Sequence, residues 1–222
     1  MKLRVNIRFK KNVSGIALCL LVSLIAFSYI SVSGNKQNRE LLVSWQPITK
    51  PTDARTHTTS AFSPSNHNAT LARSDELVIY GGSGGSAKDS PQHSYYSRGW
   101  SSGSQWWQLS GISLEGYQLI ELSFWVRSSD TGPRNFAIEY SRNGNDWYPL
   151  TDSSNVRLQY TITTDNKLAK QGPIPISSSI NNINEVSIRF INTDTQSVSG
   201  DTIKSTGTSY ITDIVITGVA LT

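Results

Sequence analysis

The sequence predicts an all-β protein: one antiparallel β-sandwich of jelly-roll topology, with about eight strands between residues 41 and 222. Three observations predict this fold. Large apolar residues alternate with polar ones in several short runs, clusters of turn-forming residues separate these runs, and no stretch repeats with a helical period. A hydrophobic N-terminal segment precedes the predicted sandwich.

The clearest strands lie near the centre of the chain. Residues 118–127 carry a large apolar side chain, such as Phe124, at every second position, so these side chains are predicted to face the core. Residues 135–141 alternate in the same way and place Glu139 on the outer face. The dipeptide Asn143-Gly144 then indicates a tight hairpin, so the whole segment is predicted to be an antiparallel meander.

Other strands follow from the same signals. They are predicted in residues 41–45, 77–80, 156–162, 186–190 and 210–221, and in a strand that begins at residue 147. The polar stretches between them are predicted to be loops, among them residues 46–68, 81–86, 95–100, 163–179 and 192–207. Trp106 and Trp107 are adjacent, so in a strand they must point to opposite faces. One of them is predicted to lie in the core, and the other under a loop or against a ligand.

The first 33 residues are predicted to be a secretory signal peptide. Five basic residues and no acidic one precede an apolar run of about 20 residues, and residues 31–33 offer the small side chains that signal peptidase requires. The run is also long enough to span a bilayer, so an uncleaved anchor is the alternative. Cys19 lies within the run, but Leu18 is larger than the residue that a lipoprotein site requires before its cysteine. Residues 34–40 are predicted to be a spacer.

Charge and cysteine content argue against a nucleic-acid-binding protein and against a protein stabilised by disulfides. The whole chain has 20 basic and 16 acidic residues, but five of the basic ones precede Gly34. The remaining chain has 15 basic and 16 acidic residues and a net charge of −1, so nucleic-acid binding is not predicted. No cysteine follows Cys19, so an exported form would have no disulfide and would depend on its hydrophobic core.

Short motifs resemble those of the galactose-binding-like jelly rolls. Residues 138–147, IEYSRNGNDW, look like a discoidin-type hairpin. Residues 131–133 and 211–214 are similar to a turn and a closing strand in a related module of secreted bacterial proteins. The resemblance extends over residues 41–221 and implies a jelly roll that binds glycans or other surface ligands through loops at one end. The disulfide of the discoidin subfamily is absent, so membership of that subfamily is not implied.

Two groups of aromatic residues are candidates for ligand binding. Trp125 lies on the polar face of its strand together with Arg127, and an indole beside polar side chains can stack on the apolar face of a sugar. Trp100, Tyr96 and Arg98 form the second group, in a predicted loop, where binding residues concentrate. The alternatives are structural: a second layer covers Trp125, or Trp100 closes one end of the sandwich.

Asp213 is the candidate metal ligand. It interrupts a β-branched strand, where a charge is unfavourable unless it is paired or metal-bound. The resemblance implies that such a carboxylate can hold a structural Ca²⁺, for which Asp53 and Asp75 are the further ligands suggested. An ion pair with an arginine or plain exposure to solvent is the alternative, and no other cofactor is predicted.

The sequence shows no arrangement typical of a catalytic site. The three histidines lie in polar stretches without metal-ligand spacing, and no two carboxylates stand out as a glycosidase pair. We therefore predict a secreted or cell-surface, non-catalytic module that binds an extracellular glycan. The first alternative is a structural or adhesion protein that binds another cell-surface protein, and the second is a secreted polysaccharide-active enzyme. Membrane contact is predicted only with an uncleaved N-terminal segment.

Overall fold

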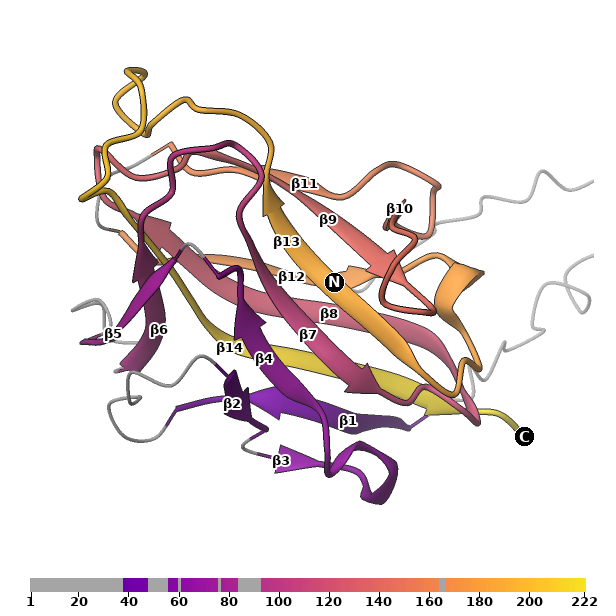
Figure 1. The fold of residues 1–222 in the computed structure, drawn as a ribbon. Coiled ribbons are helices and arrows are strands. Elements are labelled where there is room, and N and C mark those ends of the chain that lie inside the picture. Colours follow the sequence, from indigo (N-terminus) through magenta and orange to yellow (C-terminus); the bar gives the residue numbers. More distant parts are fainter. Residues whose placement is uncertain (1–37, 48–55, 60, 76, 84–92, 164–166) are drawn as a thin grey trace, which may run out of the picture. The chain divides into compact units, whose positions relative to one another are not determined.

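The computed structural model describes residues 38–47, 56–59, 61–75, 77–83, 93–163 and 167–222. They form two antiparallel sheets packed face to face (Figure 1). Sheet A contains β1 (Arg39–Trp45), β3 (Ala61–Phe62), β5 (Val78–Ser83), β6 (His93–Arg98), β8 (Tyr117–Ser128), β12 (Ala169–Pro175) and β14 (Thr208–Ala220). Sheet B contains β2 (Thr56–Thr58), β4 (Thr70–Arg73), β7 (Trp106–Ile112), β9 (Asn135–Ser141), β10 (Tyr148–Pro149), β11 (Gln159–Thr161) and β13 (Val186–Asn192). Two short 3₁₀ turns, η1 (Pro64–Asn66) and η2 (Ser178–Ile180), are the helical elements of the described residues.

The strand order places β14 inside sheet A. It pairs with β8 on one side, and with both β6 and β1 on the other, while β12 lies beyond β8. Sheet B has the order β2-β4-β7-β13-β9, and both β10 and β11 pair with the free edge of β9. Every strand pair is antiparallel. The predicted all-β jelly-roll sandwich is therefore confirmed.

The core lies between the sheets, because every second residue of the long strands points inwards. The rings of Phe124 in β8 and Phe190 in β13 meet across the two sheets, with centroids 4.8 Å apart. Trp107 is buried, whereas its neighbour Trp106 is partly exposed on the outer face of sheet B. The predicted opposite orientation of these two indoles is confirmed. The largest fully buried side chains are Trp45, Trp100, Trp107, Phe124, Phe136 and Phe190.

Four segments predicted to be loops contain strands. Residues 95–98 belong to β6, residues 81–83 continue β5, β12 lies within residues 163–179, and the short strands β2 and β3 lie within residues 46–68. β12 was missed because its sequence, AKQGPIP, contains a Gly-Pro pair, and the register between β12 and β8 shifts at this pair. β6 was missed because its sequence, HSYYSR, does not alternate aliphatic with polar residues.

One predicted strand is much shorter than expected. Of residues 156–162, three form β11, and the apolar side chain of Val156 is 60% exposed. At the N-terminus, β1 begins at Arg39, two residues before the expected start of the domain. The predicted signal peptide, residues 1–33, lies outside the described residues. No helix within the described ranges is both long and apolar enough to cross a membrane.

Candidate functional site

A row of three side chains crosses the outer face of sheet A. The strand register places Tyr210 of β14 between Tyr96 of β6 and Arg127 of β8. The rings of Tyr96 and Tyr210 stack, with centroids 4.9 Å apart and planes 19° from parallel. The guanidinium carbon of Arg127 lies 3.8 Å from the centroid of the Tyr210 ring. Ring stacking and cation–π attraction therefore hold all three side chains in one arrangement.

Trp125 lies in the adjacent row of the same face. It precedes Arg127 by two residues in β8, so both side chains project from the same side of the sheet. Its cross-strand neighbours are Thr212 of β14 and Lys170 of β12. Trp125 is partly exposed and Lys170 is exposed. This places the indole of Trp125 next to two cationic side chains, those of Arg127 and Lys170, on a surface that a ligand can reach.

Arg98 extends this surface at the end of β6. It follows Tyr96 by two residues, pairs with Thr208 of β14 and is exposed. We call the set of side chains on this face the sheet A patch; its members are Tyr96, Arg98, Trp125, Arg127, Lys170 and Tyr210. Four of the five residues predicted to bind a ligand therefore share one face of one sheet, although they come from two distant segments of the sequence.

Trp100 is the fifth predicted residue, and it does not belong to this face. Its side chain is 0% exposed, and its indole N–H donates a hydrogen bond to the carbonyl oxygen of Ser97 at 3.0 Å. Its ring packs edge-on against Phe136, with centroids 5.5 Å apart, and lies 6.1 Å from the ring of Trp107. In contrast to the predicted ligand contact, the indole of Trp100 is buried and offers no surface to a ligand in this structure. We therefore leave Trp100 out of the candidate site.

Sequence reasoning missed two members of the patch. Tyr210 lies in a correctly predicted strand, but only the register with β6 and β8 shows that it joins Tyr96 to Arg127. Lys170 lies in β12, a strand that the sequence does not predict. The signal available for Tyr210 was the alternation of its strand, which places it on the face opposite to that of Ile211.

Asp213 is the extra residue of a β-bulge in β14. The register between β14 and β8 shifts between Thr212 and Val215, and Asp213 adopts a φ of +44°. Burial raises the pKa of its carboxyl group, and the Thr212 hydroxyl and the charge of Lys170 offset only part of this effect. The interruption seen in the sequence therefore corresponds to an irregular position in the strand.

The described residues around Asp213 do not make up a calcium site. Ca²⁺ takes about six to eight oxygen ligands. Within the described part of the chain, no group of three or more His, Cys, Asp or Glu side chains is placed to hold a metal. Lys170 also brings a positive charge to Asp213. Asp75 is exposed, and Asp53 lies outside the described residues.

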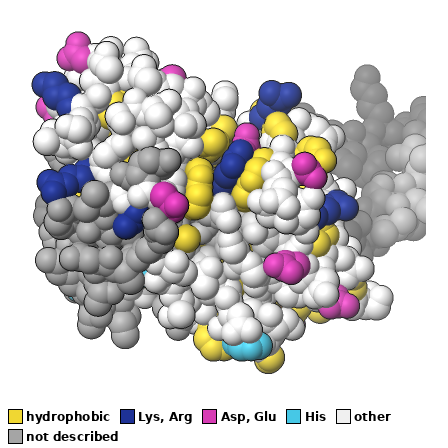
Figure 2. Space-filling model, in the orientation of Figure 1, with side chains coloured by type: hydrophobic (Ala, Val, Ile, Leu, Met, Phe, Trp, Pro, Cys, Tyr) yellow, Lys and Arg dark blue, Asp and Glu magenta, His cyan; other side chains and the backbone are white. Residues whose placement is uncertain are grey.

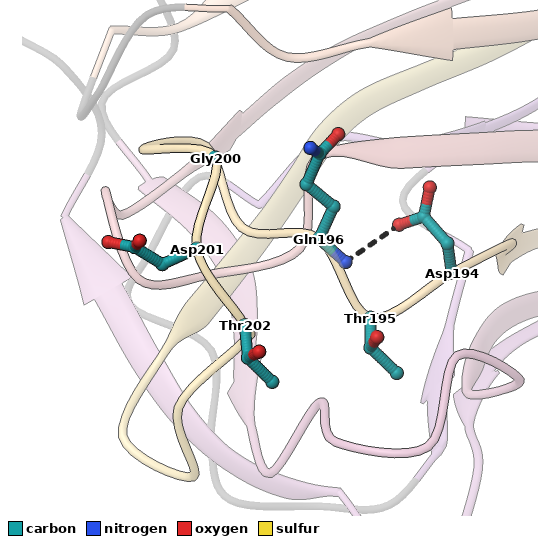
Figure 3. Close-up of a pocket in the computed structure, with 6 residues that line it drawn as sticks. All are labelled: Asp194, Thr195, Gln196, Gly200, Asp201 and Thr202. Carbon is teal, nitrogen blue, oxygen red and sulfur yellow. Dashed lines mark hydrogen bonds between the residues drawn. The ribbon is translucent and has the colours of Figure 1, made fainter.

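A polar pocket lies in the long loop between β13 and β14. It has a volume of about 560 Å³ and is lined by Asp194, Thr195, Gln196, Gly200, Asp201 and Thr202. The carboxylates of Asp194 and Asp201 point to opposite sides of it (Figure 3). Asp194 accepts hydrogen bonds from the backbone N–H of Gln196 at 2.9 Å and from the amide group of Asn135 at 2.7 Å. Asp194 thus stabilises the loop, and none of the lining residues offers an aromatic surface.

Comparison with known proteins yields structural matches alone. No protein-family model and no curated protein matches the sequence. Among solved structures, the CBM22-1 xylan-binding domain of Xyn10C from Paenibacillus barcinonensis is 10% identical, with a TM-score of 0.46 over 84% of this chain and 99% of that domain. A putative sugar binding protein from Bacteroides thetaiotaomicron is also 10% identical, with a TM-score of 0.46 over 81% of this chain and 100% of that protein.

An adhesin domain gives a similar match. The K1 cleaved adhesin domain of Lys-gingipain from Porphyromonas gingivalis is 15% identical, with a TM-score of 0.40 over 75% of this chain and 98% of that domain. At these identities and TM-scores, the fold assignment rests on the two sheets themselves and the site on its own geometry.

Proposed function

We propose that this protein is a non-catalytic carbohydrate-binding module and that a glycan binds on the sheet A patch. The observation that carries the proposal is the partly exposed indole of Trp125, next to the ordered row of Tyr96, Tyr210 and Arg127. An indole offers an apolar surface to the C–H face of a sugar ring. Arginine and lysine donate hydrogen bonds to hydroxyl oxygens, and a tyrosine hydroxyl both donates and accepts them.

The fixed arrangement of the patch supports this proposal. Long side chains lose conformational entropy when a ligand immobilises them, which opposes binding. Here Arg127 is already held over Tyr210, and Tyr210 is stacked on Tyr96. A ligand that binds this face therefore meets side chains that have lost much of their freedom on folding.

We also propose that the protein acts outside the cell. The support is the basic, apolar and small-residue layout of residues 1–33. N-terminal sequencing of protein recovered from the culture medium tests it, and the first residue should lie near Gly34. An intact Met1 in the membrane fraction would instead support the uncleaved anchor.

A glycan array followed by affinity electrophoresis tests the binding function. The wild type should bind at least one glycan, and Trp125→Ala should weaken that binding about fivefold, because an aromatic contact of this kind contributes roughly 1 kcal/mol. Phe62→Ala is the matched control, since Phe62 is 48% exposed on β3, at the far edge of sheet A. It should leave binding unchanged.

Two results would contradict the proposal. Equal glycan binding by the wild type and Trp125→Ala would remove the site from the sheet A patch. Failure to bind any glycan would remove the function and favour the alternative, a module that adheres to another protein. Release of new reducing ends from a bound polysaccharide would show catalysis and contradict a non-catalytic role.

A further inference from the structure

The outer face of sheet B carries a second ordered set of side chains. Trp106 of β7, Ile191 of β13 and Ala137 of β9 form an apolar row, because the register pairs Ile191 with each of the other two. All three are partly exposed. Figure 2 looks onto sheet B and shows hydrophobic side chains beside basic and acidic ones over its middle strands.

The adjacent row is polar. It contains Gln108 of β7, Arg189 of β13 and Glu139 of β9, again with the residue of β13 in register with both neighbours. Nε and Nη2 of Arg189 both bind Oε2 of Glu139, at 2.7 and 2.6 Å. The ring of Trp147, from the hairpin between β9 and β10, lies 4.1 Å from the guanidinium carbon. The guanidinium group of Arg189 is therefore held both by the carboxylate of Glu139 and by the ring of Trp147.

The ion pair keeps hydrogen-bonding capacity towards solvent. The side chains of Arg189 and Glu139 are 19% and 24% exposed. Among the described residues, no further hydrogen bond reaches either side chain, so Nη1 of Arg189 and Oε1 of Glu139 remain available. The pair therefore offers a donor and an acceptor, and sugar hydroxyls can accept from the first and donate to the second.

We propose that this face is a second saccharide-binding site, that its ligand is a neutral glycan, and that Trp106 and the Arg189–Glu139 pair are its main contacts. We call this set the sheet B strip; its members are Trp106, Gln108, Ala137, Glu139, Trp147, Arg189 and Ile191. The apolar row receives the C–H face of a sugar, and the polar row receives its hydroxyls. The strip shares no residue with the sheet A patch, so the two proposals stand on separate observations.

Charge and size select the ligand class. The positive charge of Arg189 is already matched by Glu139, so the strip offers no net attraction to an acidic glycan. Three strands about 4.8 Å apart and two rows about 7 Å apart give an area of roughly 10 by 7 Å. A stable protein interface covers roughly 800 Å² on each partner, which is far more than this strip. A short stretch of a neutral polysaccharide fits both the matched charge and the small area of the strip.

Two separate sites would let one molecule hold two polysaccharide chains. Each site alone needs only modest affinity, because a molecule bound at one site has a raised effective concentration for the other when both chains lie close together. The expected property is stronger retention on a dense polysaccharide than on a short oligosaccharide.

Affinity electrophoresis through gels that contain arabinoxylan, galactan or hydroxyethylcellulose tests the second site. The proteins compared are the wild type, Trp106→Ala, Trp125→Ala and the double variant. Phe62→Ala is the control, because it removes an exposed aromatic side chain that belongs to neither site. Trp106→Ala should weaken retention by at least one of these neutral polysaccharides about tenfold, and the double variant should lose it. Glu139→Gln should weaken the same retention several-fold, because it removes the charge that fixes Arg189. A melting curve for each variant confirms that it is folded.

The outcomes separate the two sites. Retention of Trp106→Ala that equals the wild type in every gel overturns the second site, and the sheet A proposal then stands or falls with Trp125→Ala. Loss of retention in Trp106→Ala but not in Trp125→Ala supports the second site and overturns the sheet A patch. If no gel retards the wild type, and polygalacturonate does not either, both sites are overturned. If polygalacturonate alone retards the wild type, the neutral-glycan site is overturned.

Discussion

The guanidinium carbon of Arg127 lies 3.8 Å from the centroid of the Tyr210 ring, and the ring of Tyr96 stacks on the same tyrosine. The three residues come from β8, β14 and β6, so the contact forms only when these strands pair. Because Tyr210 takes part in both contacts, its removal breaks both of them at once. The arrangement of the sheet A patch therefore depends on a residue that sequence analysis did not single out.

Tyr210→Leu should lower the free energy of unfolding by about 1–2 kcal/mol, since aromatic stacking and cation–π contact each contribute roughly 0.5–1.5 kcal/mol. It should also weaken glycan binding, because Tyr96 and Arg127 each lose a contact that helps to orient them. Urea unfolding measures the first effect and affinity electrophoresis the second. Phe62→Leu serves as the control on an exposed position. Unchanged stability of Tyr210→Leu would show that the stacked row contributes nothing.

Trp100→Ala should lower the free energy of unfolding by about 3–5 kcal/mol, as expected for a large buried aromatic side chain. Its glycan affinity should equal that of the wild type at temperatures where the variant is folded, because Trp100 is 0% exposed. Thermal denaturation and electrophoresis at low temperature measure the two quantities. Tyr148→Ala, at a position that is 54% exposed, is the control. A stable Trp100→Ala that has lost glycan binding would return Trp100 to the site.

Local pattern was enough to predict the strands that bury regular apolar residues. The alternation around Phe124 identified β8 and its two faces, so Trp125 and Arg127 were correctly placed on the outer side. β6 and β12 were not predicted, because neither alternates and β12 contains a Gly-Pro pair. Their position in sheet A is determined by pairing with β14 and β8, which is a long-range property.

The errors in the candidate site have the same origin. Trp100 was placed in a loop beside Tyr96, but burial depends on Trp107 and Phe136, which come from other strands. The Arg189–Glu139 pair was not predicted either, because it depends on the register between β13 and β9. Sequence alternation shows which face a residue occupies, but not which side chains it meets there.

Phe124 and Glu139 should respond very differently to truncation. Phe124→Ala should lower the free energy of unfolding by about 3–5 kcal/mol, because its ring packs against Phe190 and Tyr160 in the core. Glu139 faces outwards as predicted, but its pairing with Arg189 means that Glu139→Ala should lower stability by about 1 kcal/mol rather than leave it unchanged. Urea unfolding of both variants checks this. Equal losses would contradict the assignment of the two faces.

His57 should make the protein less stable in mild acid. Its ring lies 4.6 Å from the ring of Tyr95, and burial, with a smaller contribution from the charge of Arg73, lowers its pKa. A lowered pKa in the folded state means that the unfolded chain takes up the proton first, so stability should fall as the pH drops below about 6.5.

The measurement for His57 is a series of melting temperatures between about pH 8 and pH 5. His57→Phe should lose less stability over this range than the wild type, because it has no group to protonate. His67→Gln, at an exposed position, should follow the wild type. Identical pH profiles for the wild type and His57→Phe would exclude this effect.

Asp213→Asn should raise the melting temperature at pH 7. Burial raises the pKa of Asp213, so the folded state favours the protonated carboxyl group, and this contribution to stability is lost as the pH rises through the folded-state pKa. Asparagine removes the buried charge and tolerates the positive φ of the bulge. The advantage of the variant should shrink as the pH falls, because the raised pKa lets the wild-type carboxyl group take up a proton earlier than an ordinary aspartate does.

Melting curves of both proteins in EDTA and in excess calcium extend this test to the predicted metal. A calcium ion bound through Asp213 would raise the melting temperature of the wild type in calcium, because a ligand that binds the folded state alone stabilises it. Asp213→Asn would lose that rise. Because no group of three or more His, Cys, Asp or Glu side chains among the described residues is placed to hold a metal, and Lys170 adds a positive charge, we expect equal wild-type melts in the two solutions. Such a result contradicts the calcium prediction and leaves Asp213 as a strand-bulge residue.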